Sequence, residues 1–188
     1  MDTQVRQLWI GKIDALCQKE NWQYAQFLCK EMLYNEPNFI DARRILYRAA
    51  QHTYPQQKLQ RWMRIVVLFF KTLWYLFKIK TKYRELIEGM DELITTDPNN
   101  ILFLRLFGEV MSSFAFYETT IFVIECIPED QRNDADLLLQ GEAFSGTGDY
   151  AMAVDIANKV LAKAPDNVRA RDLLWQASVE QSMGTEES

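Results

Sequence analysis

The amino-acid sequence predicts an all-α protein made of stacked helix pairs, and three observations support this fold class. Only 7 Gly and 5 Pro occur in 188 residues, so few positions favour loops. Leu, Ala, Gln, Glu and Arg, which favour helices, are abundant. Short proline-containing segments recur between stretches whose apolar residues follow a helical period. With 48% hydrophobic residues, the chain can form a core without disulfide bonds.

Three proline segments mark the ends of the expected helix pairs: "NEPNF" around Pro37, "TDPNN" around Pro98 and "KAPDN" around Pro165. Pro98 and Pro165 lie 67 residues apart, which is close to two units of about 34 residues. Pro37 and Pro98 lie 61 residues apart, which is one such unit with 27 extra residues. The sequence therefore predicts an internal repeat that is interrupted between Pro37 and Pro98.

The clearest unit covers residues 134–167 and reads DADLLLQGEAFSGTGDYAMAVDIANKVLAKAPDN. Two apolar helix faces flank the turn "GTGDY": Leu137, Gly141 and Phe144 before it, and Ala153, Ala157 and Val160 after it. This unit resembles the tetratricopeptide repeat, a helix–turn–helix motif of 34 residues. The resemblance implies that Gly141 lets the two helices approach closely and that Pro165 closes the unit.

The resemblance extends over one expected domain, residues 1–182, with four or five units forming an α-solenoid. The first unit, about 6–39, has a larger residue, Ile13, where the family has a small one. Residues 40–100 fit either one interrupted unit or a shortened unit at 40–66 followed by a full one at 67–100. A further unit covers about 101–133, residues 168–182 form a capping helix, and the tail 183–188 is expected to be disordered.

The interrupted interval contains an unusually apolar and basic helix at 56–82, with RWMRIVVLFFKTLWYLFKIK at 61–80. Its unbroken apolar runs are too short to cross about 30 Å of hydrocarbon. Three alternatives remain: a core helix, a docking or self-association surface, and a helix lying on an anionic membrane surface. The candidate partner-binding residues in this helix are Trp62, Phe69, Phe70, Lys71, Trp74, Tyr75, Phe77 and Lys78.

The resemblance also implies that other proteins bind in a groove lined by the first helix of each unit. On the matching positions, Arg44, Arg48 and His52 form a cationic row, and Arg105 belongs to a later unit. Such a row can bind an acidic peptide, because Arg pairs with a carboxylate through two hydrogen bonds. The alternative is that these residues pair with the acidic surface of their own domain, since the chain carries 26 Asp and Glu.

Other functional classes fit the sequence less well. His52 is the only histidine in the sequence, and there is no metal-ligand spacing of Cys or His and no phosphate-binding loop, so we expect no catalytic residue, metal or cofactor. A net charge of −5 disfavours nucleic acid as a partner. Three scattered cysteines and an N-terminus without a signal-peptide pattern favour a cytoplasmic protein.

The predicted function is a non-catalytic protein-binding scaffold or adaptor. It would use the groove, the apolar basic helix, or both. Its partner is a protein or peptide, with an acidic segment favoured by the cationic row and a second copy of the chain as another candidate. The alternative is a peripheral membrane-associated protein anchored by the apolar basic helix.

Overall fold

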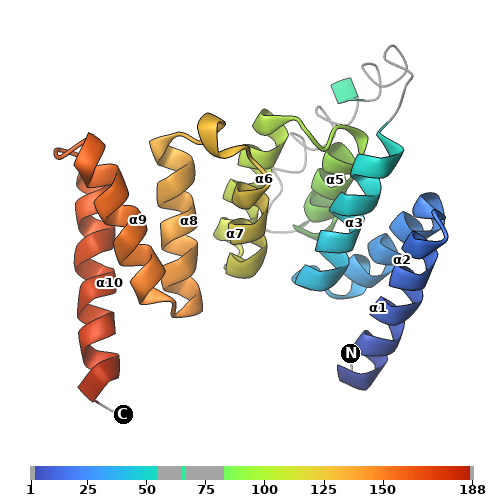
Figure 1. Ribbon diagram of the computed structural model, residues 1–188, viewed down its shortest axis with the longest axis horizontal. Coiled ribbons are helices and arrows are strands. Elements are labelled where there is room, and N and C mark those ends of the chain that lie inside the picture. Colours follow the sequence, from blue (N-terminus) through green and yellow to red (C-terminus); the bar gives the residue numbers. More distant parts are fainter. Residues whose placement is uncertain (1–2, 55–64, 67–82, 187–188) are drawn as a thin grey trace. The chain divides into compact units, whose positions relative to one another are not determined.

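The computed structural model describes residues 3–54, 65–66 and 83–186, and every element in these ranges is helical (Figure 1). The expected all-α class is therefore confirmed for this part of the chain. The elements are α1 (Thr3–Gln18), α2 (Trp22–Asn35), α3 (Ile40–Thr53), α5 (Tyr83–Thr96), α6 (Ile101–Ser113), α7 (Tyr117–Glu125), the 3-10 helix η1 (Glu129–Gln131), α8 (Asp134–Thr147), α9 (Tyr150–Lys163) and α10 (Val168–Glu186).

The same tight turn joins α1 to α2, α6 to α7 and α8 to α9. One residue of each turn has a left-handed backbone: Glu20 and Ala115 at φ 57°, and Gly148 at φ 85°. The next amide donates to the carbonyl five positions earlier, as Asp149 N does to Phe144 O at 2.9 Å. This Schellman arrangement satisfies the last carbonyls of the first helix. Glu20 and Ala115 carry a Cβ, so the left-handed conformation costs about 1–2 kcal/mol at each.

A second kind of turn recurs at the three proline segments. In each, the residue before the proline accepts a hydrogen bond from the amide three positions later, as Ala164 O does from Asn167 N at 3.0 Å. Proline fits the second position of such a turn because its φ is already set. The side chains of Asn100 and Asn167 then accept hydrogen bonds from the backbone amides of Phe103 and Ala170. These two asparagines therefore cap the helices that follow. The proline segments therefore end one helix and start the next.

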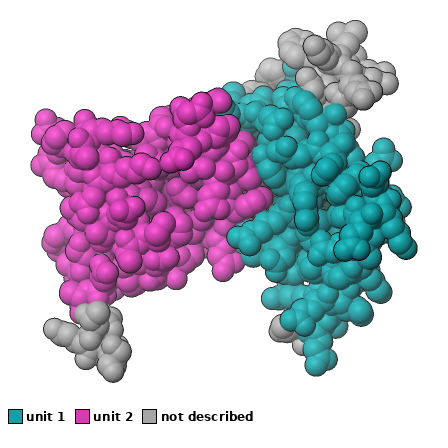
Figure 2. Space-filling model, viewed as in Figure 1, with its two compact units in different colours: residues 1–103 teal, residues 104–188 magenta. Residues whose placement is uncertain are grey.

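Residues 1–103 form one compact unit, which is teal in Figure 2. Within it, α1 packs against α2 and α3, and α5 packs against the same two helices. Ile13, Ala25 and Cys29 are completely buried in its core. The core of this unit therefore accommodates Ile13 at the position where the family resemblance implies a small residue.

Residues 104–188 form the second compact unit, which is magenta in Figure 2. Here α8 packs against α7, α9 and α10, and α9 packs against α10. A Cβ added at Gly141 would lie 3.0 Å from Ile156 Cγ2 of α9 and 2.7 Å from Leu173 Cδ2 of α10. Both distances are shorter than the 3.5–4.0 Å or so of ordinary carbon contacts. The glycine therefore allows a close approach to α9, as expected, and an equally close one to α10.

Two structural features bear on the domain organisation, for which one domain over 1–182 stays a prediction. The chain groups into two compact units whose boundary falls inside α6, after Phe103, and each unit has its own buried core cluster. α10 continues through Glu186, so residues 183–186 are helical although the sequence placed them in a disordered tail. No proline occurs after Val168, and Gly184 is the only glycine there, so little opposes continuation of this helix.

Candidate protein-binding surface

The cationic row expected at residues 44–52 lies on one exposed face of α3. The opposite face of this helix is buried and consists mainly of small and aliphatic residues: Ala42, Ile45, Leu46, Ala49 and Ala50. Arg44, Arg48 and His52 are exposed and follow one another at intervals of four residues. This spacing sets successive residues about 6 Å apart along one side of a helix. We call Arg44, Arg48 and His52 the cationic face of α3.

An ion pair joins the cationic face to α1. Arg48 Nη2 lies 3.2 Å from Asp14 Oδ1, and the two side chains are 54% and 45% exposed. A pair this exposed contributes about 0–1 kcal/mol to stability, because water competes for both charges. Breaking the pair of Arg48 and Asp14 would therefore cost the fold little.

A ring stack ends the cationic face. The imidazole of His52 lies parallel to the indole of Trp22, with 4.0 Å between ring centroids and 3° between planes. Beside this stack, Gln26 Nε2 donates a hydrogen bond to Thr53 Oγ1, and Thr53 Oγ1 donates to Ala49 O. The end of α3 is thus fixed against the start of α2, which gives the His52 ring a defined orientation.

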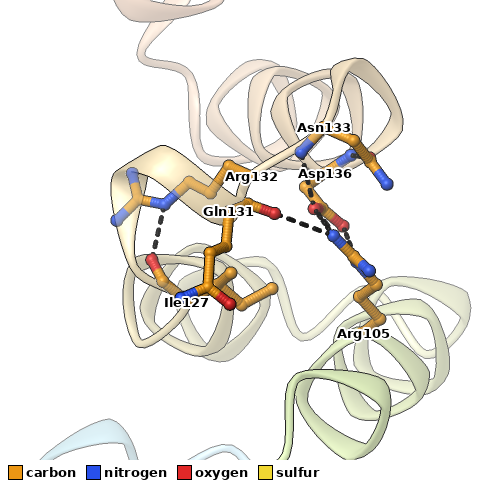
Figure 3. Close-up of polar contacts among 6 residues, drawn as sticks. All are labelled: Arg105, Ile127, Gln131, Arg132, Asn133 and Asp136. Carbon is orange, nitrogen blue, oxygen red and sulfur yellow. Dashed lines mark hydrogen bonds and ion pairs between the residues drawn. The ribbon is translucent and has the colours of Figure 1, made fainter.

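Arg105, the fourth residue predicted for the groove, lies in the other compact unit and is held inside a polar cluster (Figure 3). Its Nη2 donates to Asp136 Oδ2 at 2.8 Å and to Gln131 O at 3.0 Å, and its Nε donates to Asp136 Oδ1 at 2.9 Å. The hydrogen bonds to Asp136 raise the pKa of Arg105. Asp136 is only 5% exposed and also accepts the amide of Asn133 at the start of α8. Releasing Arg105 would leave this buried carboxylate without its charge partner, which is costly.

The same cluster holds the end of the preceding helix. Arg132 Nε donates to Ile127 O at 2.8 Å, and Arg132 Nη2 donates to Glu125 O at 3.0 Å. These carbonyls belong to the last turn of α7 and the residues after it, where no helical amide remains to pair with them. Arg105 and Arg132 therefore fix the linker between α7 and α8 from two sides, whereas Arg48 makes a single exposed ion pair.

A buried ion pair in the first unit was not foreseen from the sequence. Arg43 is 2% exposed and Asp91 6%, and Arg43 Nη2 lies 3.4 Å from Asp91 Oδ2 and donates to Pro37 O at 2.8 Å. Burial raises the pKa of Asp91 and lowers that of Arg43, and each charge partly opposes the effect on the other. The helical period carried the signal, since Arg43 shares a side with the buried Leu46 and Ala50 three and seven positions later.

The partner-binding residues predicted in the apolar basic helix lie outside the described residues: Trp62, Phe69, Phe70, Lys71, Trp74, Tyr75, Phe77 and Lys78. Within the described ranges, no three His, Cys, Asp or Glu side chains are grouped as metal ligands. Over those same ranges, no helix combines the length and apolar character that crossing a membrane requires. The thiols of Cys17 and Cys29 are buried, and burial raises the pKa of Cys29 to about 12.

No family model matches the chain, and no curated protein matches its sequence.

Proposed function

We propose that this protein is a tetratricopeptide-like α-solenoid and a non-catalytic scaffold or adaptor that binds an acidic segment of another protein on the cationic face of α3. One observation carries the proposal: Arg44, Arg48 and His52 share an exposed helix face. A cytoplasmic setting fits it, since Cys17 and Cys29 are buried free thiols.

The recurring turns support the solenoid architecture. The left-handed residues Ala115 and Gly148 occupy the same place in successive helix pairs and lie 33 residues apart, close to the family period of about 34. In a solenoid, the first helices of neighbouring pairs lie side by side. α1 contacts α3 and α8 contacts α10, in agreement with that arrangement. Ion pairs bridge the same helices, Asp14 to Arg48 and Glu142 to Arg169.

The spacing of the two arginines suits an extended acidic peptide. Arg44 and Arg48 are separated by four residues of helix, which is about 6 Å. Alternate residues of an extended strand point to one side and lie about 6.6–6.8 Å apart. A segment with carboxylates at alternate positions can therefore present one to each guanidinium, and Arg pairs with carboxylates bidentately. The His52 ring, fixed by Trp22, offers an additional contact beyond Arg48.

Selection from a random peptide library displayed on phage tests this proposal. The wild-type chain is expected to enrich peptides with Asp or Glu at alternate positions, and Arg44→Ser with Arg48→Ser is expected to abolish that enrichment. A matched control removes two exposed lysines, also four residues apart, from α9: Lys159→Ser with Lys163→Ser. Selected peptides without acidic enrichment, or an enrichment that the arginine variant preserves, would contradict the proposal.

A further inference from the structure

The outer face of α1 and α2 carries an open groove of about 410 Å³. Aliphatic and aromatic side chains form most of its wall, including Trp9, Leu16 and Tyr24. The charged residues that line it are Lys12 and Lys19, and Lys12 Nζ lies 5.3 Å from the centroid of the Trp9 ring. The lining of the groove is therefore mainly apolar and carries two positive charges.

The exposed side of α1 has the spacing of a helix-packing seam. Val5, Leu8, Lys12, Ala15 and Lys19 follow one another at intervals of three and four residues, and all five are exposed. Leu8 is 60% exposed, although a leucine at such a position normally packs against another helix. This alternation of three and four is the pattern with which two helices pack along their length.

α10 presents a complementary stripe in the second unit. Its inner side is buried through Ala170, Leu173 and Ala177. On the outer side, Val168, Asp172, Trp175, Val179 and Met183 lie along one line, and Trp175 is 69% exposed. Tryptophan is enriched among the residues that contribute most to protein interfaces, so the exposed Trp175 makes this stripe a candidate interaction surface.

We propose that the chain assembles head to tail, with the outer stripe of α10 from one copy packed into the α1–α2 groove of the next. Three features of this chain match. Lys12 and Lys19 line the groove, whereas the stripe carries Asp172. Ala15, a small residue of the α1 seam that also lines the groove, leaves room for a large residue such as Trp175 from the stripe.

Length is the third matching feature. α1 has 16 residues and α10 has 19, which correspond to about 24 Å and 28 Å of helix. The two surfaces differ from each other, so the contact is heterologous. Only the first and last copies of the assembly then keep an unused surface. A contact between one helix and one groove belongs with small interfaces, below about 1,200 Å², so we expect reversible association. This inference goes beyond the proposed function and does not involve the cationic face of α3.

Sedimentation velocity of the full chain at increasing concentration tests the assembly. The wild type is expected to grow beyond a dimer as concentration rises, and added salt is expected to weaken the association because Lys12, Lys19 and Asp172 are exposed. Trp175→Glu disrupts the outer stripe of α10, and Lys12→Glu disrupts the α1–α2 groove. Each substitution is expected to weaken association at least about tenfold. Both residues are exposed, so the melting temperature of each variant should match the wild type.

Mixing the two variants distinguishes this arrangement from a symmetric dimer. The Lys12→Glu chain keeps an intact α10 and the Trp175→Glu chain keeps an intact groove. Their equimolar mixture is therefore expected to regain association and to stop at a one-to-one dimer. If either variant lowers the melting temperature, Lys19→Glu and Val179→Ser take their places.

Three results would overturn the inference. A wild-type chain that stays monomeric up to about 1 mM would show that the surfaces do not bind each other. Association that neither variant weakens would place the contact elsewhere. A mixture that fails to regain association would exclude the head-to-tail pairing of α10 with the groove.

Discussion

The close packing around Gly141 leads to a graded prediction about stability. Gly141→Ala adds a Cβ that would lie 2.7 Å from Leu173 Cδ2 and 3.0 Å from Ile156 Cγ2. Carbon atoms prefer about 3.5–4.0 Å, so the overlap is about half an ångström or more on two sides. Leu173 and Ile156 are only 3% and 6% exposed, so they have little room to move. Such overpacking typically costs about 1–3 kcal/mol.

A second effect of the same substitution has the opposite sign. Alanine is favoured over glycine inside a helix by about 0.5–1 kcal/mol. Gly141→Ala should therefore lower the free energy of unfolding by about 0.5–2 kcal/mol once the helix preference is counted. Gly141→Leu places more atoms in the same space and should cost more.

Gly11 provides the matched control, because it lies inside α1 and a Cβ there would meet nothing within 4 Å. Gly11→Ala should raise the free energy of unfolding by about 0.5–1 kcal/mol through helix preference alone. Gly108→Ala should fall between the two, since its Cβ would lie 3.1 Å from the flexible end of Ile124. Urea unfolding measures all three. If Gly141→Ala stabilised the protein as much as Gly11→Ala does, the close approach of α8 to α9 and α10 would be refuted.

Three further predictions concern a turn, a buried charge and a buried thiol. Ala115→Gly should stabilise the protein by about 1 kcal/mol and Gly148→Ala should destabilise it by about 1–2 kcal/mol, because both positions have a left-handed backbone. If both variants melted at the same temperature as the wild type, that result would argue against the recurring turn. In urea unfolding, Asp91→Asn should cost about 3–5 kcal/mol because Arg43 stays buried, while Asp14→Asn in the exposed pair should cost about 0–1 kcal/mol; similar costs would contradict the difference in burial. Burial raises the pKa of Cys29 from 9.0 to about 12. The unfolded chain therefore loses the thiol proton first, and the stability that the buried neutral thiol contributes is full below pH 9 and falls as pH rises toward 12. The loss is at most about 1.4 kcal/mol per pH unit. Cys29→Ala should remove that loss, and an unchanged pH profile would count against it.

The helix boundaries were largely predictable from local signals. Proline fixes φ and removes a hydrogen-bond donor, so Pro37, Pro98 and Pro165 marked the connections in the sequence and lie in hydrogen-bonded turns in the structure. The other turns were harder to recognise. Only Gly148 showed the glycine that a left-handed residue favours, whereas Glu20 and Ala115 adopt the same conformation without it.

The charge partners were beyond the reach of the sequence, because they depend on which helices meet. The basic row at Arg44 and Arg48 was visible from four-residue spacing, but the pairing of Arg48 with Asp14 required α1 to lie against α3. The sequence also placed Arg105 in the binding groove. In the structure, its guanidinium instead donates hydrogen bonds to Asp136 and to Gln131 O in the linker between α7 and α8. Arg43 was overlooked because adjacent arginines suggest a solvated surface, although its helical position is on the buried side.

A titration with a defined peptide tests whether the cationic face of α3 binds an acidic segment. The probe is a fluorescein-labelled decapeptide of alternating Glu and Leu, and its fluorescence anisotropy is followed as protein is added. Arg44→Ser with Arg48→Ser is expected to weaken binding by about 5–30-fold, which corresponds to about 1–2 kcal/mol for two exposed charge contacts. Lys159→Ser with Lys163→Ser should leave the affinity unchanged, added salt should lower it, and a decapeptide of alternating Lys and Leu should not bind. Equal affinity for the wild type and the arginine variant would contradict the assignment of the site to the cationic face of α3.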